Sequence, residues 1–189
     1  QRRELSYDGL RGRFVFDQDV KAEPKRLRAG HGLGLGFGRA SMNGENEDLF
    51  FLSNGHISPA YYSVLSRAGY FPVEELSTFR KINTRLQGHP TTHEGLPGIR
   101  IASGSLGQGM SVAIGAAEAK KLNGDDKIIY TLHGDGELQE GQVWESAMYA
   151  SGKKIDNLIS TIDLNGKQID GSTDEVLPMG SIKAKFEAF

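Results

Sequence analysis

The sequence predicts an α/β protein in which a parallel β-sheet is flanked by helices. Two short apolar, β-rich runs, residues 127–132 and 157–163, each lead directly into a turn. Between them, residues 138–151 repeat their apolar side chains with helical spacing. Such a strand–helix–strand unit has a right-handed crossover, which brings the carboxyl ends of both strands to one edge of the sheet. Open α/β sheets bind ligands at that edge.

The crossover helix has one apolar face. The residues expected on or beside that face are Val143, Ala147, Ala150, Trp144 and Met148. This pattern is typical of a helix that packs against a sheet.

Upstream of this unit, the sequence predicts a strand, two helices, a long loop and a third helix. Their ranges are 48–52, a helix that starts after Ser58-Pro59, 73–79, 83–104 and 106–122. Serine followed by proline is a favourable helix start. A loop as long as 83–104 in a compact domain is usually functional or mobile. The small residues of the 106–122 helix allow close packing against a sheet, a helix or a second subunit.

The ends of the chain differ from this orderly middle part. Residues 1–46 are predicted to be an atypical head, with one possible strand at Phe14–Phe16 and glycine at every second position from 30 to 38. That glycine pattern is not a dinucleotide-binding fingerprint. Residues 47–189 are predicted to form one domain that is truncated at its C-terminal end, because the sequence stops within a predicted helix. Since the chain also begins with Gln1, we expect a fragment that is incomplete at both ends.

Composition excludes several classes of protein. The 189 residues are 38% apolar and 24% charged with a formal net charge of −2, a profile typical of soluble globular proteins without a nucleic-acid partner. No apolar stretch approaches the ~20 residues of a membrane span, so no membrane partner is expected. The absence of cysteine excludes disulfides and thiolate metal sites, and it fits a cytoplasmic location.

A candidate metal–phosphate site follows the two strands of the crossover unit. Asp135 comes after the first strand, between Gly134 and Gly136, and Asn165 follows the second strand. A carboxylate and an amide oxygen suit Mg²⁺ or Ca²⁺, with phosphate oxygens and water completing the shell. The glycines let the backbone turn sharply and approach a phosphate. Either segment alone would be an ordinary turn, but their placement after consecutive strands favours a metal site.

The five histidines all lie within two residues of a glycine, and none is expected at a core-facing position. They are His31, His56, His89, His93 and His133. A transition-metal pair of His89 and His93 is not expected, because prolines and glycines exclude the helix that their spacing would need.

Several motifs together resemble the transketolase family. They are residues 52–56, 88–90, 103–109, 134–145 and 165–171, which occur in the family's order. The resemblance covers about residues 47–189 and points to the N-terminal, thiamine-diphosphate-binding subunit or a fragment of it. It implies the fold of the diphosphate-binding domain, with thiamine diphosphate and Mg²⁺ (or Ca²⁺) as cofactors.

The resemblance also implies roles for individual residues. His56 and His89 match histidines that line the cofactor and donor-sugar site, so both are expected to be catalytic and His56 also to bind cofactor. The further cofactor contacts are Gly104, Leu106, Gly134, Asp135, Gly136 and Asn165. The metal ligands are Asp135, Asn165 and the backbone carbonyl of Lys167.

Two other positions carry weaker implications. Glu140 matches a glutamate that bonds across the family's subunit interface, although an acidic residue near a helix N-terminus is equally well explained by the helix dipole. His31 lies in a glycine-rich loop that lacks the long helix following it in transketolases, so its match is weak.

By this resemblance the protein would transfer a two-carbon ketol unit from a ketose phosphate to an aldose phosphate. The family activates its cofactor with a glutamate from a pyrimidine-binding domain, and a chain of 189 residues is too short to contain that domain. We therefore expect the chain to be inactive alone and to need a C-terminal, pyrimidine-binding partner subunit, in a homodimer or heterotetramer.

Three alternatives remain open from the sequence. One is another thiamine-diphosphate enzyme, similar to deoxyxylulose-phosphate synthase. A second is a non-catalytic fragment that binds a partner but no cofactor. The third is a Mg²⁺-dependent phosphohydrolase, which ranks last because no second acid suited to act as a nucleophile lies close to Asp135.

Overall fold

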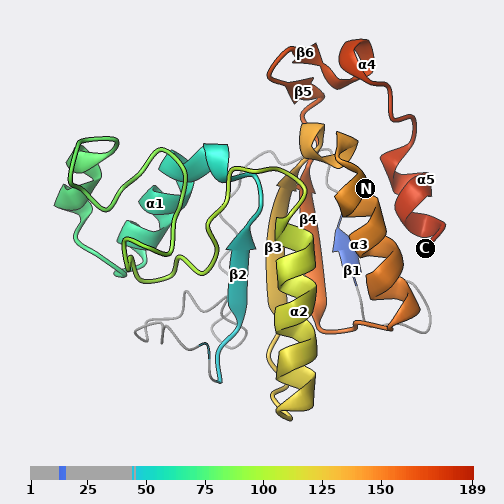
Figure 1. Cartoon of the computed structure of the whole chain (residues 1–189), viewed down its shortest axis with the longest axis horizontal. Coiled ribbons are helices and arrows are strands. Elements are labelled where there is room, and N and C mark those ends of the chain that lie inside the picture. The colour runs from blue at the N-terminus through green and yellow to red at the C-terminus, as the bar shows by residue number, and fades with distance from the viewer. Residues whose placement is uncertain (1–12, 16–43, 45) are drawn as a thin grey trace, which may run out of the picture.

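A computed structural model describes residues 13–15, 44 and 46–189 of the chain. Four parallel strands form one sheet in the order β1-β4-β3-β2 (Figure 1). Their bounds are Arg13–Val15, Leu49–Leu52, Ile129–Gly134 and Leu158–Asp163 for β1, β2, β3 and β4. The predicted fold class is confirmed. The glycine-rich stretch of the head and His31 lie outside the described residues.

The helices and the short second sheet complete the chain in a simple order. They are η1 Gly55–Ile57, α1 Ser58–Arg67, η2 Val73–Thr78, α2 Gly109–Leu122, η3 Gly136–Gln139, α3 Gly141–Gly152, β5 Lys167–Gln168, β6 Gly171–Ser172, α4 Thr173–Val176 and α5 Ile182–Glu187. Figure 1 shows α2 and α3 on one face of the main sheet and the β5–β6 hairpin above its carboxyl edge. Among the described residues, no helix is long and apolar enough to cross a membrane.

Alternating side chains divide the interior into two apolar clusters. Along β2, Leu49 and Phe51 pack in the cluster that includes α2, α3 and α5, whereas Leu52 joins the cluster around α1. A strand points successive side chains to opposite faces, so β2 contributes to both clusters. Tyr61 and Tyr62 of α1 then tie down the long loop predicted over 83–104, because their hydroxyl groups donate to backbone carbonyls within it. That loop is confirmed.

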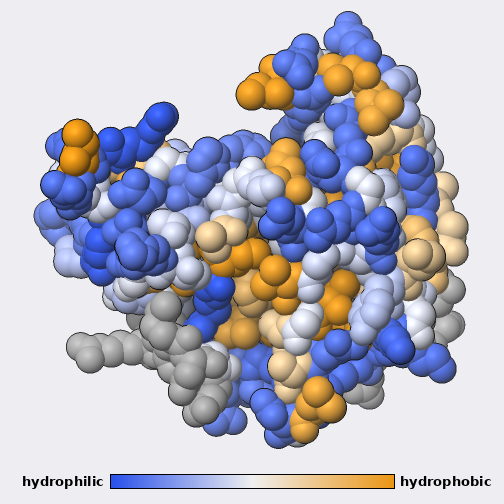
Figure 2. Space-filling view, viewed as in Figure 1, coloured by the Kyte–Doolittle hydropathy of each residue, from blue (hydrophilic) through white to orange (hydrophobic). Residues whose placement is uncertain are grey.

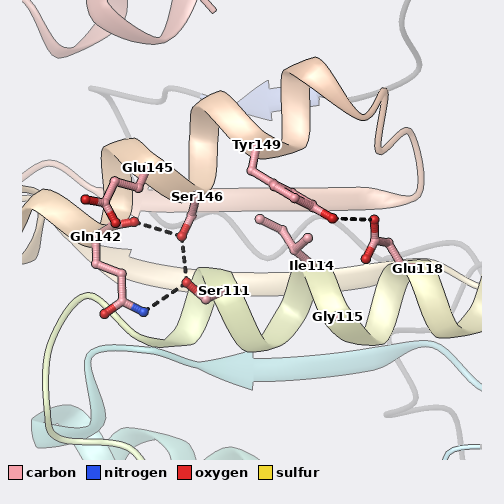
Figure 3. A pocket seen from close by; sticks show the side chains of 8 residues that line it. All are labelled: Ser111, Ile114, Gly115, Glu118, Gln142, Glu145, Ser146 and Tyr149. Carbon is pink, nitrogen blue, oxygen red and sulfur yellow. Dashed lines mark hydrogen bonds between the residues drawn. The ribbon is translucent and has the colours of Figure 1, made fainter.

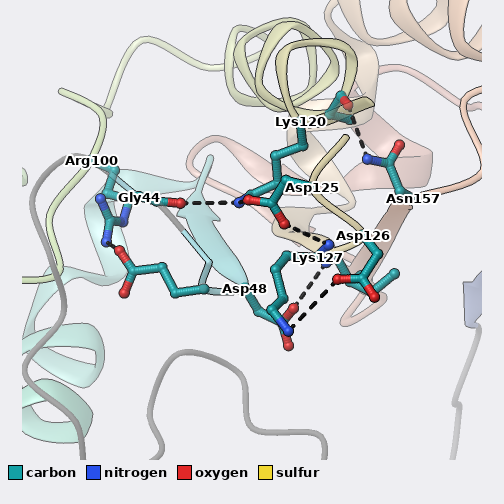
Figure 4. A network of polar contacts seen from close by, with 11 residues as sticks. Gly44, Asp48, Arg100, Lys120, Asp125, Asp126, Lys127 and Asn157 are labelled. Atoms are coloured by element: carbon teal, nitrogen blue, oxygen red, sulfur yellow. Dashed lines mark hydrogen bonds and ion pairs between the residues drawn. The ribbon is translucent and has the colours of Figure 1, made fainter. Parts of the chain in front are cut away.

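The amino-terminal ends of the strands are held by a polar network (Figure 4). The buried Lys120 ammonium, near the end of α2, donates to the Asp125 carboxylate at 2.5 Å and to the Gly44 carbonyl at 3.0 Å. Asp125 also accepts a hydrogen bond from the Lys127 backbone N–H. Asp48 accepts one from the Ile128 N–H at 2.9 Å, which links the start of β2 to β3.

The crossover helix differs from its prediction at its start. Instead of one helix over 138–151, η3 is followed by an extended residue, Glu140, whose ψ is 127°, and α3 begins only at Gly141. Val143, Ala147 and Ala150 are buried as predicted. Met148, predicted to lie beside that face, is 59% exposed. The break occurs because the chain must first turn around Asp135 before the helix can run back along the sheet.

Candidate functional site

Five loops meet at the carboxyl edge of the sheet, and every predicted site residue from His56 to Lys167 lies on one of them. The segments that contain these loops are 53–56, 88–90, 103–109, 134–140 and 164–168. Four of them follow β2, precede α2, follow β3 and follow β4, so the topology explains why these segments converge here. The 88–90 segment is joined to the 103–109 segment through the Pro90 carbonyl.

The Asp135 carboxylate links the loops that follow β3 and β4. It is buried, and its Oδ1 accepts from the Gly136 N–H at 2.9 Å. Its Oδ2 accepts from the Gly166 N–H at 2.5 Å. The predicted neighbourhood of Asp135 and the 165–167 turn is therefore present in the structure.

Gly136 lets the turn at Asp135 fit closely against the next loop. A Cβ atom at Gly136 would lie 2.6 Å from the Gln168 Cβ and 3.3 Å from the Lys167 carbonyl oxygen. Only glycine fits this gap without a shift of the neighbouring backbone or side chain. The close fit brings the Lys167 carbonyl to the Asp135 turn.

The oxygen atoms offered by this turn suit a hard divalent cation. Asp135 supplies a carboxylate, Asn165 an amide oxygen that accepts from the Lys167 N–H at 2.8 Å, and Lys167 a carbonyl. Within the described part of the chain, no cluster of three or more histidine, aspartate or glutamate side chains could hold a metal. A Mg²⁺ site here would instead combine one carboxylate with neutral oxygens and phosphate, which is how Mg²⁺ usually binds beside a phosphorylated ligand.

His89 packs against the segment that precedes α2. Gly104 has a φ of +140°, and a Cβ atom there would lie 2.7 Å from the His89 Cδ2 atom. The Ser103 N–H donates to the Pro90 carbonyl at 3.1 Å, which fixes the two loops together. His89 and Gly104, which lie on different predicted segments, are thus direct neighbours, and the imidazole of His89 remains exposed.

The loop after β2 completes the edge. Gly55 contacts the Ser103 backbone so closely that a Cβ atom would lie 2.5 Å from its carbonyl. His56, the next residue, is exposed in η1, and Leu106 is half-buried. The buried Asn54 Oδ1 and Ser103 Oγ atoms have no hydrogen-bond partner among the described residues. Buried polar atoms without partners are uncommon, so these two atoms can still accept or donate a hydrogen bond to water or a ligand.

A buried carboxylate that the sequence did not single out lies beneath these loops. Glu137 is 2% exposed, and its Oε1 accepts from the Ser53 hydroxyl and from the Gly107 N–H, the latter at 2.9 Å. Its Oε2 accepts from the Gly134 N–H at 3.3 Å. Burial raises the pKa of this carboxyl, but the facing His133 ring and the hydroxyl and amide donors outweigh it, so the pKa lies below its ordinary value.

His133 corrects a prediction, because it occupies a core-facing position of β3 and is completely buried. Its Nε2 lies 2.8 Å from the Thr131 hydroxyl, which in turn is hydrogen-bonded to Ser160. Its Nδ1 lies 3.4 Å from a carboxylate oxygen of Glu137, a close electrostatic contact without hydrogen-bond geometry. The strand continues two residues beyond its predicted end, and this extension turns His133 inward.

Ser53 and Glu137 were missed because they meet only through the fold. Ser53 and Glu137 are separated by 84 positions. One local signal was available: Gly107 and Gly109 alternate just before a helix, which indicates that another segment approaches the backbone closely. In the structure, a Cβ atom at Gly109 would lie 2.3 Å from the Ser53 hydroxyl oxygen.

A separate open groove of about 390 Å³ lies between α2 and α3 (Figure 3). It is lined by Ser111, Ile114, Gly115, Glu118, Gln142, Glu145, Ser146 and Tyr149. The Ser111 and Ser146 hydroxyls lie 2.7 Å apart across it, and Tyr149 donates to Glu118 at 3.1 Å. None of the predicted site residues lines this groove.

Comparison with known proteins connects this arrangement to one family. The family model described as "Transketolase, thiamine diphosphate binding domain" matches residues 40–189. The chain is 44% identical over 142 residues to the 6-deoxy-6-sulfo-D-fructose transketolase subunit SqwG of Clostridium sp. (strain MSTE9), covering 75% of this chain and 51% of that protein. It is 42% identical over 142 residues to an apulose-4-phosphate transketolase subunit of Actinobacillus succinogenes, again covering 75% and 51%.

A solved structure agrees with these matches. The crystal structure of transketolase from Campylobacter jejuni superposes with a TM-score of 0.68 at 36% identity, covering 76% of this chain and 23% of that one. The chain spans about half the length of the two curated relatives named above.

Proposed function

This chain belongs to the transketolase family, through a match to its thiamine-diphosphate-binding domain, and from that premise we propose that it is the diphosphate-binding half of a transketolase. With a pyrimidine-binding partner chain, it would transfer a two-carbon ketol unit from a ketose phosphate to an aldose phosphate. The observation that carries the proposal is the oxygen set of Asp135, Asn165 and the Lys167 carbonyl, gathered at adjacent strand ends of the sheet.

We propose that this oxygen set holds a divalent cation, Mg²⁺ in the first instance, against the diphosphate. Asp135 would supply the charged ligand, while Asn165 and Lys167 supply neutral ones. Gly134 and Gly136 would let the diphosphate approach the backbone. The 103–109 segment would contact the cofactor rings through Gly104 and Leu106.

Thiamine diphosphate, when bound, supplies the electron sink for breaking and making carbon–carbon bonds. The chain's own residues would bind and orient the reactants. His56 and His89 are both exposed at the loop edge, where an imidazole can donate or accept hydrogen bonds with sugar hydroxyls and move protons. The His89 ring packs directly against the Gly104 backbone, where a side chain would leave no room for the ring.

A partner subunit is part of the proposal. Both curated relatives described above are named as transketolase subunits. In this chain, Val112, Met148 and Tyr149 are large apolar side chains of α2 and α3 with 43%, 59% and 44% exposure. Figure 2 shows apolar surface over and beside α2. Exposed apolar surface is typical of interaction sites. Glu140 is also exposed, at the start of α3.

Cofactor binding provides the first test. Calorimetric titration of the complete protein with thiamine diphosphate and Mg²⁺ should show saturable binding that depends on the metal. Asp135→Ala should weaken it by about a hundredfold or more, because even residues outside the coordination shell are worth about 10–100-fold. Asp170→Ala, which removes an exposed carboxylate from the neighbouring hairpin, is the control and should bind normally. Binding that survives Asp135→Ala would disprove the metal assignment.

The reaction itself separates the proposal from its alternatives. Ketol transfer between paired sugar phosphates should appear only when the partner subunit is added. Activity with pyruvate in place of a ketose donor would indicate a deoxyxylulose-phosphate synthase-like enzyme. A chain that binds its partner but not the cofactor would be a non-catalytic fragment.

We further propose residues 47–189 as the diphosphate-binding domain, with a homodimer or heterotetramer as the assembly and the cytoplasm as its location. The absence of cysteine from the sequence fits that location, because no disulfide is needed.

A further inference from the structure

One buried side chain joins three loops of the proposed site, in addition to the direct contacts between the loop after β2 and the 103–109 segment. Glu137 Oε1 accepts hydrogen bonds from Ser53, after β2, and from the Gly107 N–H, before α2. Its Oε2 accepts from the N–H of Gly134, in its own loop. A carboxylate can accept up to about four hydrogen bonds, so this single group serves donors from three segments at once.

The Ser53 hydroxyl extends this arrangement to the first residue of α2. Its oxygen donates to Glu137 and accepts from the Gly109 N–H at 3.1 Å. Gly109 cannot be replaced without a shift, since a Cβ atom would lie 2.8 Å from the Ser53 Cα atom. The 103–109 segment is therefore held at two amides: the Gly107 N–H bonds the Glu137 carboxylate directly, and the Gly109 N–H bonds the Ser53 hydroxyl, which in turn donates to that carboxylate.

We propose that Glu137 is a positioning residue whose buried carboxylate fixes the 103–109 segment against the turn that carries Asp135. This inference rests on the proposed function, because the segment matters only if Gly104 and Leu106 contact the cofactor. Glu137 itself lies beneath the turn, with 2% exposure, and acts through the loops. Without an acceptor at this position, the Gly107 amide and Ser53 hydroxyl would be buried unpaired, and the segment would lose its alignment with the diphosphate turn.

The test compares two buried charged residues at opposite ends of α2. Glu137→Met removes the acceptor at nearly constant volume, and Lys120→Met removes the buried cation at the other end of the helix. In the complete protein, Glu137→Met should raise the Kd for thiamine diphosphate with Mg²⁺ by about tenfold or more. Lys120→Met should lower the Tm without changing that Kd.

A conservative variant distinguishes hydrogen bonding from general packing. Glu137→Gln keeps one acceptor oxygen for Ser53 and the Gly107 N–H, so its Kd should stay within about threefold of wild type. With the partner subunit present, Glu137→Met should regain most of its kcat at saturating cofactor while the KM for thiamine diphosphate stays raised. A purely structural role would not raise the KM for thiamine diphosphate while leaving kcat at saturating cofactor nearly intact. Equal affinity in Glu137→Met and wild type, or an equal loss in Lys120→Met, would overturn the proposal.

Hydrogen exchange without cofactor keeps the inference separate from the proposed function. The Gly107 and Gly109 amides should exchange faster in Glu137→Met than in wild type, and unchanged exchange would overturn the coupling. If wild type binds no thiamine diphosphate, the proposed function fails, while hydrogen exchange still decides whether Glu137 holds the 103–109 segment.

If Glu137→Met does not fold, Ser53→Ala replaces it in the test. Removal of the bridging hydroxyl should speed exchange of the Gly109 amide and raise the Kd for thiamine diphosphate about threefold. Unchanged exchange and an unchanged Kd would count against the proposal.

Discussion

A buried charged side chain lies at each end of the sheet, Lys120 at the amino ends of the strands and Glu137 at their carboxyl ends. The two side chains hold different kinds of segments together. At the amino edge, Lys120 is satisfied by Asp125 and the Gly44 carbonyl, and the polar groups mainly fasten strands and helix together. At the carboxyl edge, Glu137 is satisfied by donors on three glycine-containing loops. Three nearby buried atoms there, Asn54 Oδ1, Ser103 Oγ and His133 Nδ1, have no hydrogen-bond partner among the described residues, whereas the amino edge has one such atom, Asn157 Oδ1.

Under the proposed function, this difference means that one α/β scaffold assigns stability and binding to opposite edges of its sheet. The buried cation at the amino edge is paired by the protein itself, so its charge is already used within the fold. The carboxyl edge keeps its loops close through glycines that have no room for a side chain, such as Gly109 and Gly136. Under the proposed function, this is the edge at which a diphosphate would approach the backbone.

Asp125→Ala should have the largest effect on stability. It leaves the buried Lys120 ammonium with only the Gly44 carbonyl, and an uncompensated charge of this kind costs about 3 kcal/mol. Urea denaturation of the complete protein would measure the loss. Thiamine diphosphate affinity of the folded fraction should be unchanged, and a parallel loss of affinity would break the proposed separation between the two edges.

Gly109→Ala should come next, with a loss of about 1–3 kcal/mol from overpacking against Ser53. Unlike Asp125→Ala, it should also weaken cofactor binding, because it pushes α2 away from the loop after β2. Gly152→Ala is the matched control at the end of α3, where a Cβ atom meets nothing within 4 Å. It should be neutral or stabilising by about 0.5–1 kcal/mol, and a similar loss in both variants would mean that crowding at Ser53 is not the cause.

The smallest expected effect is a pH dependence at the amino edge. The hydrogen bond from Lys120 is the main reason that the pKa of Asp125 lies below its ordinary value of 3.8. A group with a depressed pKa contributes stability above its unfolded value and loses it as the pH falls through the folded value. The stability difference between wild type and Asp125→Asn should therefore shrink below about pH 3.8, as measured by denaturation at several pH values. A constant difference would exclude the carboxylate charge as its source.

Local patterns predicted the sheet, its crossover and the meeting of Asp135 with the 165–167 turn, because strand ends in a parallel sheet must share an edge. They could not predict Glu137, since its partners Ser53 and Gly107 are distant in sequence. His133 was misplaced for a related reason: only the pairing of β3 with β4 extends the strand far enough to turn that side chain inward. The break before α3 was also missed, because the spacing of Val143 and Ala147 is the same whether the helix begins at residue 138 or at residue 141.

The strand order of the sheet also has a consequence for the speed of folding. The hydrogen bonds that join β3 to β4 close a short span, with Thr131 and Ser160 only 29 positions apart. The link between β2 and β3 spans 80 positions from Asp48 to Ile128. Closing the longer loop costs more chain entropy before stabilising contacts can form. The β3–α3–β4 unit should therefore form first, and β2, with the loop that carries His56, should dock onto it late in folding.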